Sequence, residues 1–572
     1  MKYPLIETKF NFLLTLIFIL GINSIVNAQS GGQVEERVVV IEKESKIDLP
    51  NANRNYEKIS TLPVSPKPLA QSYSFEDINI TLPKVNTKIK VPTLPSEALT
   101  KLYPYFVKAG FGNYGTSFLE GFINNKRSDK LNYGLHFYHM ASANGAVKTD
   151  LVKNFSRNSS NLVNGHIQYF TKKNTINAEM GFARTRFNYY GLNTSVLDTL
   201  IPLNKFNKET IKQVYNTFEI GTSIENTNKT DPLDYKLGLK FYNFNDFYKA
   251  SENEIVAQAT TSYDLSNKDG ININAELSNS TRKDSSSINR TFFILKPKYW
   301  LNYGVFSGKV GFNIAYTNDT ISAFNKLHFY PSFHGEAMLK EQSLIVFAGL
   351  DGEMQKNTWR SFAKENPYIG NNTLLYHTNK ALELYGGAKG SLMQRLNYQV
   401  KLGYANYKNL YLYNNSINDS SRFSVFYSPA NSSIVNFTTD LSYELQKRWN
   451  IGVEAQFFGY TIGSSDSLKI GAWHRPTSKI NCYSTYNLNN KIYFNFNFYY
   501  IGGIKARQFS VENSKDIELP SIIDLSLKVE YKVSNSFSAF IELNNLLNKK
   551  YQLYQYYPSL GANFLIGLTY SF

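Results

Sequence analysis

Cysteine is almost absent from this chain: its 572 residues include one, Cys482. A single thiol excludes an intramolecular disulfide framework. Long apolar runs are also missing beyond the first 30 residues, and a transmembrane helix would need about 20 consecutive apolar residues. Histidine is scarce, with seven in all, and His136 and His139 stand three apart in a predicted strand, so they point to opposite faces. We therefore predict no helical membrane span, no metal site and no cofactor.

Signatures of catalysis and of nucleic-acid binding are missing as well. No serine stands in a Gly-x-Ser-x-Gly context, and the glycine-rich stretch 111–115 lacks the strand–loop–helix frame of a phosphate loop, so we interpret it as a hairpin turn. The formal net charge is +16, but the basic residues form no basic helix or cluster. We predict that the protein is not an enzyme and binds no nucleic acid, and the scattered positive charge favours lipid phosphates or anionic solutes as partners.

Aromatic residues are what the chain has in excess. They make up 15% of it, with 42 Tyr and 40 Phe against 4 Trp, which is typical of strands and of the girdles at membrane interfaces. The first 28 residues have the parts of a secretory signal peptide: Lys2 and Lys9, an apolar run over residues 10–22, and a small-residue cleavage site ending at Ala28. The mature chain is expected to begin near Gln29 and to be exported.

Residues 29–100 differ from the rest by their many prolines, which forbid long helices and central strands and favour an extended chain. We predict a periplasmic segment without a fold of its own. Within it, residues 36–41 resemble the TonB box, a short exposed strand to which an energy-coupling partner adds a strand of its own. The alternative is a short apolar strand with no coupling role. The patch consists of Glu36, Arg37, Val38, Val39, Val40 and Ile41.

Residues 101–572 alternate between amphipathic strands and turns rich in Asn, Ser, Asp, Lys and Gly. The last strand is the clearest, because the apolar residues Phe564, Ile566, Leu568, Tyr570 and Phe572 share one face and small or polar residues occupy most of the other. A strand with an oily side and a polar side suits the wall between a lipid bilayer and a wet lumen.

Connector lengths predict how these strands are joined. Short links such as 126–130 and 488–491 alternate with long ones such as 191–210 and 356–380. Tight periplasmic turns and long outer loops are typical of outer-membrane barrels. We therefore predict an all-β fold: a transmembrane antiparallel β-barrel of about 22 strands, preceded by the proline-rich segment. Because short and long links alternate and the strand number is even, both ends of the barrel are expected in the periplasm.

The end of the chain resembles the C-terminal barrel signature of TonB-dependent receptors. The resemblance implies an outer-membrane location, a terminal aromatic read by the outer-membrane assembly machinery, and a TonB-type energy-coupling protein as a partner. One departure is Ala562, where the family usually has Arg. Another is that the family's globular plug has no counterpart here except the proline-rich segment. The matching residues are Asn545, Leu546, Asn548, Tyr551, Pro558, Gly561, Gly567, Tyr570 and Phe572.

Two features bear on a binding site. Pairs of basic residues share a strand face, and if that face is the lumen, the interior favours anions; the alternative is an ordinary polar lining compensated by Glu and Asp. The loop 356–380 carries more aromatic residues than a solvated loop needs, so we expect it to fold into the barrel mouth or to bind a partner. The basic pairs are Arg184 with Arg186, Lys236 with Lys240, and Lys296 with Lys298.

Two functions follow from these observations. The first is uptake or passage of a solute across the outer membrane. The alternative is a structural or assembly component that docks other outer-membrane proteins through its barrel and periplasmic segment. An open barrel of this size would leak, so we also expect the lumen to be occluded, by the proline-rich segment first, or else by inward-folded loops or a separate protein.

Overall fold

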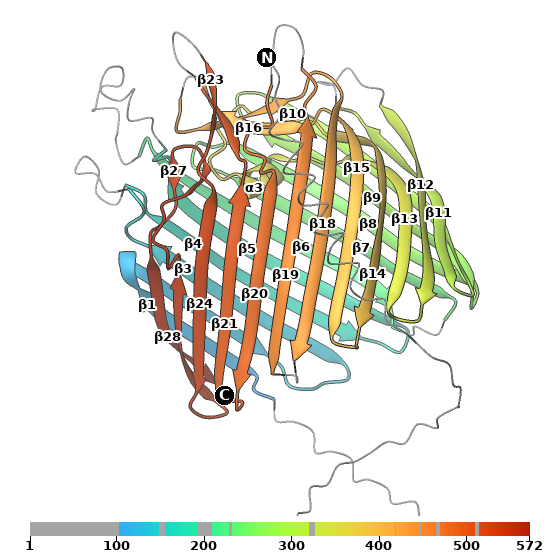
Figure 1. The fold of residues 1–572 in the computed structure, drawn as a ribbon, viewed down its shortest axis with the longest axis horizontal. Coiled ribbons are helices and arrows are strands. Elements are labelled where there is room, and N and C mark those ends of the chain that lie inside the picture. Colours follow the sequence, from blue (N-terminus) through green and yellow to red (C-terminus); the bar gives the residue numbers. More distant parts are fainter. Residues whose placement is uncertain are drawn as a thin grey trace, which may run out of the picture. The chain divides into compact units, whose positions relative to one another are not determined.

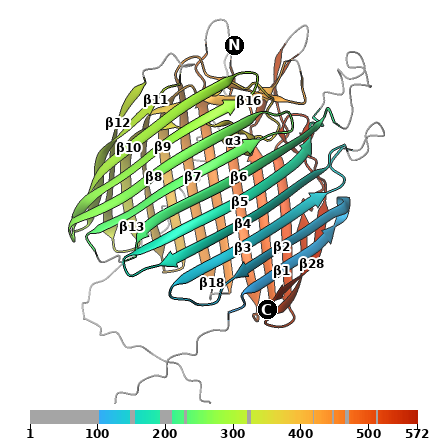
Figure 2. The ribbon, with the colours of Figure 1, turned by 180° about the vertical axis from the view of Figure 1, so that it is seen from behind.

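The computed structural model describes residues 102–147, 155–191, 209–227, 231–319, 326–417, 419–445, 448–464, 470–509 and 514–572. The predicted signal peptide, the proline-rich segment and the TonB-box-like strand lie outside these residues. Within them the chain forms one antiparallel sheet of 22 strands. Strand β1 (Tyr105–Gly112) pairs with β28 (Asn563–Ser571), which closes the sheet into a barrel (Figures 1 and 2).

The predicted strand number is therefore confirmed, and closure removes every open sheet edge. The remaining barrel strands are β2 (Thr116–Asn124), β3 (Leu131–Ser142), β4 (Asn158–Phe170), β5 (Asn174–Asn188), β6 (Lys212–Asn226), β7 (Leu233–Asn245), β8 (Ser251–Ser266), β9 (Asp269–Lys283), β10 (Ser287–Tyr303), β11 (Phe306–Thr317), β12 (Leu327–Lys340), β13 (Leu344–Gln355), β14 (Thr378–Leu392), β15 (Leu396–Lys408), β18 (Ser432–Leu445), β19 (Trp449–Thr461), β20 (Ser478–Leu488), β21 (Ile492–Gly502), β24 (Ile522–Lys532) and β25 (Phe537–Asn544).

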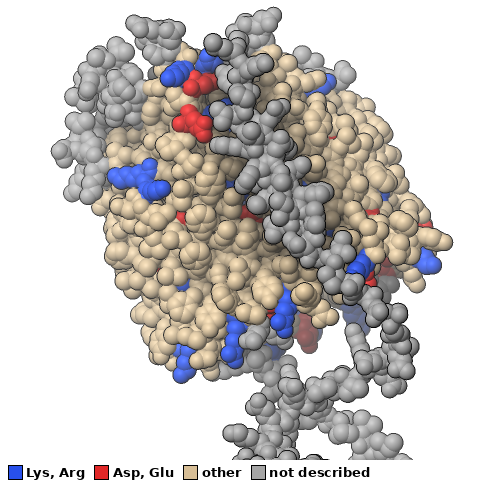
Figure 3. Space-filling model, viewed as in Figure 1, with Lys and Arg blue, Asp and Glu red and all other residues tan. Residues whose placement is uncertain are grey.

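Side-chain alternation decides which face of each strand is turned outward. In β28, Ile566, Leu568 and Tyr570 are about half exposed, whereas Leu565 and Thr569 are buried. The same alternation runs around the wall and produces a continuous apolar outer surface. Figure 3 shows few charged side chains on the middle of one side of the barrel, with Lys and Arg mainly toward its two ends. An apolar band of this kind is the surface that a bilayer requires.

The two ends of the barrel differ in their connections. At one end the turns are short: three residues, 489–491, join β20 to β21, and two of them, Asn489 and Asn490, have positive φ, a conformation that tight hairpin turns use and Asn tolerates. The C-terminus lies at this end, where the Phe572 amide donates to the Tyr105 carbonyl at 3.0 Å. The long connections are at the other end, and we call them the outer loops after the orientation that the sequence predicts.

The outer loops contain secondary structure of their own. They hold helix α3 (Trp359–Glu365) and the hairpins β16 (Tyr411–Asn415) with β17 (Phe423–Tyr427), β22 (Lys505–Gln508) with β23 (Lys515–Glu518), and β26 (Gln552–Tyr554) with β27 (Tyr557–Pro558). A 3-10 turn, Asn113–Gly115, joins β1 to β2, so the predicted hairpin turn at 111–115 is confirmed. Across the described part of the chain, no helix has the length and apolar character needed to span a bilayer.

Candidate functional site: the loop cluster over the barrel mouth

The outer loops meet in a buried aromatic cluster, which we call the cap. Most of its members come from connections spread around the wall, namely β5–β6, β7–β8, β13–β14, β15–β18 and β25–β28, and three come from the ends of the barrel strands β5, β6 and β7. Loops that begin so far apart on the rim can share one core only by reaching across the mouth. The buried members are Phe187, Tyr189, Tyr215, Phe244, Ala250, Trp359, Phe362, Ala363, Ile369, Leu375, Tyr413, Phe423 and Tyr557.

Helix α3 supplies the centre of the cap. Thr358 caps the helix by accepting from the Ser361 amide at 3.0 Å, and the Ser361 hydroxyl in turn accepts from the Thr358 amide, so a short helix begins at a defined residue. Trp359 and Phe362 are each 1% exposed. The Phe362 ring lies 4.8 Å from that of Tyr411 in hairpin β16–β17. The predicted folding of loop 356–380 into the mouth is confirmed.

Tyrosine hydroxyls tie the loops together by donating to backbone carbonyls. The Tyr189 hydroxyl donates to Ile369 at 3.1 Å and the Tyr554 hydroxyl to Glu365 at 2.6 Å. The Tyr368 and Tyr557 rings stack with their centroids 3.4 Å apart. These bonds satisfy loop carbonyls that burial would otherwise leave unpaired, which allows irregular backbone to be packed away from water.

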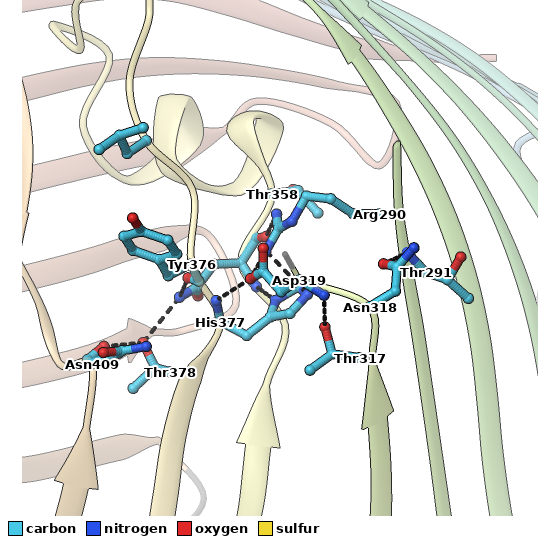
Figure 4. Close-up of polar contacts among 12 residues, drawn as sticks. Arg290, Thr291, Thr317, Asn318, Asp319, Thr358, Tyr376, His377, Thr378 and Asn409 are labelled. Carbon is cyan, nitrogen blue, oxygen red and sulfur yellow. Dashed lines mark hydrogen bonds and ion pairs between the residues drawn. The ribbon is translucent and has the colours of Figure 1, made fainter. Parts of the chain in front are cut away.

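A polar network fixes the base of the α3 loop to the wall (Figure 4). Arg290 of β10 forms a buried ion pair with Asp319 at 3.0 Å, and its guanidinium donates to the Asn357 carbonyl at 2.7 Å. The same guanidinium lies 3.1 Å from Nε2 of His377. Burial and the Arg290 cation hold the pKa of His377 well below its ordinary value. Thus three segments distant in sequence meet at one cation.

Carboxylates of β8 hold the other side of the loop. Glu252 accepts from the Trp359 and Arg360 amides at 2.8 and 3.0 Å, which are the free donors of the first helical turn. Glu254 pairs with the Arg360 guanidinium at 2.7 Å and with Lys356 at 2.8 Å. The loop is therefore held at both ends by charge and in the middle by aromatic packing.

His474, in the connection between β19 and β20, links two loops of the cap. Its Nε2 accepts from the Gln555 amide at 3.2 Å, and its Nδ1 contacts the Tyr413 carbonyl at 2.8 Å. One nitrogen thus accepts and the other donates, as in a neutral imidazole. Burial lowers the pKa of His474 to about 4.

The lysines predicted to make the lumen basic lie on the inward face, but most are compensated. Lys240 bonds to Glu179 at 2.6 Å, Lys236 to Glu225 at 3.1 Å and Lys296 to Glu353 at 2.8 Å. Lys298, in the same inward register, has no ion pair among the described residues. The alternative of a compensated polar lining describes these positions better than a basic interior does.

The prediction that Arg184 and Arg186 line the lumen is wrong. They have the parity of Met180 and Phe182 in β5, which are 58% and 45% exposed on the outer wall. The two arginines therefore lie on the outer face of the barrel and not in the lumen, because a period of two keeps residues 180, 182, 184 and 186 on one side.

The C-terminal signature residues build the last outer loop and the barrel seam. The side-chain amide of Asn545 donates to the Lys549 and Leu560 carbonyls, both at 2.7 Å. A Cβ on Gly561 would approach the Asn548 side chain to 2.4 Å, and one on Gly567 would approach the Ala109 carbonyl to 2.1 Å. These glycines permit close backbone approaches.

The polar network at Arg290, Asp319 and His377 was missed by sequence analysis. Its members belong to three different strand ends, and no local spacing relates them. The one feature of the sequence that pointed to this region was the large number of apolar and aromatic residues in loop 356–380.

Comparisons with known proteins agree with the barrel. No protein-family model and no curated protein matches the chain. Among solved structures, the FrpB iron transporter of Neisseria meningitidis is similar with a TM-score of 0.62 at 10% identity over 83% of this chain and 82% of that one. The ferric-catecholate import receptor Fiu of Escherichia coli K12 gives 0.61 at 11% identity over 83% and 82%. The ferripyoverdine receptor of Pseudomonas aeruginosa gives 0.61 at 11% over 83% and 72%. The predicted resemblance to TonB-dependent receptors is confirmed for the barrel fold.

Proposed function

We propose that this outer-membrane barrel with the fold of TonB-dependent receptors admits a solute through its lumen, and that the cap is the outer gate. The observation that carries the proposal is the α3 loop, which packs against loops from several sides of the rim. Similar solved barrels are described as an iron transporter and an import receptor, which supports uptake as the class of function.

Opening requires the α3 loop to part from hairpin β16–β17. The two segments are joined by backbone bonds: the Gly370 amide donates to the Phe423 carbonyl and the Phe423 amide to the Tyr368 carbonyl, each at 2.8 Å. The paired charges of the lumen wall provide a polar lining below the cap. That lining fits a polar solute, and the identity of the solute is left to experiment.

A disulfide across this joint tests the gate. A Cβ built on Gly370 lies 3.6 Å from the Arg422 Cβ, within the range that a disulfide needs. We would make Gly370→Cys with Arg422→Cys in a Cys482→Ser background. The protein would be reconstituted in liposomes loaded with anionic, neutral and cationic dyes, with and without reductant.

We expect the reduced protein to release dye and the oxidised protein to release none. Each single-cysteine variant should release dye equally with and without reductant. Equal release from the locked and reduced barrels would refute the gate. A parallel purification from native membranes addresses the docking alternative. Co-elution of a periplasmic energy-coupling protein would support uptake, and stable co-elution of another outer-membrane protein would support docking.

A further inference from the structure

The outer face of β5 changes character along its length. From the short-turn end it presents Ile176, Met180 and Phe182, all exposed, and then Arg184 and Arg186. The outward positions opposite the two arginines are neutral: Asn161 and Ser159 in β4, and Asn216 and Val214 in β6. A cationic patch therefore stands directly above an apolar wall.

The patch has no counter-ion. Among the described residues, neither Arg184 nor Arg186 takes part in an ion pair, and the Nε atoms of Arg186 and Arg157 are buried without a hydrogen-bond partner. Arg157 lies immediately before β4 and two residues before Ser159, the partner of Arg186. Like charges gathered on one part of a wall repel one another, and a bound anion would relieve this repulsion.

The height of the patch matches the lipid headgroups. A strand rises about 3.4 Å per residue, so at a tilt of about 45° each residue climbs roughly 2.4 Å. The ten steps from Asn174 to Arg184 thus cover the apolar band of about 25 Å. Arg184 and Arg186 lie where phosphate groups of the outer leaflet are found.

Directly below the arginines the wall is hollowed. A groove of about 820 Å³ runs over β2 to β7, and its lining includes Val163, Met180, Phe182, Ile220 and Leu239. Its floor contains Gly165, which pairs with Met180, and Ala178. Small residues between large ones leave room for a hydrocarbon chain.

We propose that β4–β6 form a specific site for a phosphorylated outer-leaflet lipid, with the phosphate on Arg184 and Arg186 and an acyl chain in the groove. Arginine suits this role because its planar guanidinium binds phosphate through two parallel hydrogen bonds. A free anion would use the patch but leave the groove empty, so the pairing of the two features selects a lipid. The site is independent of the gate proposed above.

The test uses the intact protein in phosphatidylcholine nanodiscs, titrated with a diphosphorylated diglucosamine lipid and followed by native mass spectrometry. Arg184→Gln with Arg186→Gln should weaken retention about thirtyfold, the effect of two interfacial cations. Gly165→Leu fills the groove without backbone conflict, since the nearest atoms to its Cβ are 3.7 Å away or more, and it should also weaken retention. The matched control, Lys236→Gln with Lys298→Gln, removes two inward charges and should change nothing.

Three results would overturn the proposal. They are unchanged retention in the double arginine variant, equal retention of the dephosphorylated lipid, and displacement of the lipid by inorganic phosphate as effective as displacement by more lipid. The last would make the patch a site for free anions. If the double variant does not fold, Arg184→Gln alone gives the same comparison, because Arg184 is exposed.

Discussion

Truncating Phe362 should open the cap without disturbing the barrel. The side chain is 1% exposed and lies at the centre of the loop cluster, packed on Tyr411 and, edge-on at 6.0 Å, on Tyr413. None of these contacts involves a strand of the barrel wall. Phe362→Ala therefore removes the ring contacts that join the α3 loop to hairpin β16–β17.

The size of the effect follows from burial. Replacing a fully buried Phe by Ala costs about 3–5 kcal/mol. If the substitution destabilises the closed cap by this free energy and leaves the open cap unchanged, the equilibrium constant for opening rises roughly a hundredfold to several thousandfold. A shift of that size turns a rare opening into a measurable one.

Hydrogen exchange at the joint between the loops measures this opening. The amides to follow are those of Gly370 and Phe423, which are bonded across the joint. Their exchange should accelerate by the same factor in Phe362→Ala, while amides of β21 stay protected. Leu374→Ala is the matched control, since Leu374 belongs to the same loop but is 55% exposed.

The reasoning fails if both amides exchange at the wild-type rate in a folded Phe362→Ala barrel. It also fails if Leu374→Ala accelerates exchange as much as Phe362→Ala does. The first result would mean that the loops do not open as a unit held by the aromatic cluster. The second would mean that exchange reports general loosening of the loop.

Four further predictions concern the wall, the terminus, the N-terminal segment and pH. Leu568→Arg places a charge on the lipid-facing side, where Leu568 is 52% exposed, and should cost about 2–4 kcal/mol near the midplane; normal insertion of this variant would contradict the strand placement. Deleting Phe572, which stacks on Tyr105 at 5.0 Å, should lower the amount of heat-modifiable barrel in the outer membrane, and unchanged amounts would remove the assembly-signal interpretation. Deleting Asn51–Pro95 should raise single-channel conductance if the proline-rich segment occludes the lumen, and equal conductance would leave the cap as the better candidate for occlusion. Because the pKa of His474 is lowered to about 4 in the folded protein from about 6.5 in an unfolded chain, the unfolded chain binds more protons in this range, so this histidine makes cap stability fall as the pH drops from 6.5 to 4; His474→Gln should make that fall less steep, leaving the part due to His377, whose pKa is also lowered by burial, and an unaltered profile would exclude His474 as a cause.

The sequence by itself determined the wall. Alternation with a period of two places Leu568 and Phe496 outward, and both are exposed. The contrast between short and long connectors predicted the strand number and the side on which both barrel ends lie. These properties are local, since a strand's faces and a turn's length are set by neighbouring residues. The outward position of Arg184 also follows from the sequence, because Arg184 is two residues after Phe182 in one strand and therefore shares its face.

Only the tertiary structure decided the cap. Tyr368 stacks on Tyr557, and Arg290 meets Asp319 and His377, although these residues are far apart in the chain. Such contacts depend on where closure of the barrel places each loop along the rim. Periodicity carries no information about that position, because it repeats identically in every strand. The compensation of Lys240 by Glu179 has the same origin: an ion pair across strands β5 and β7 exists only once the sheet has its register.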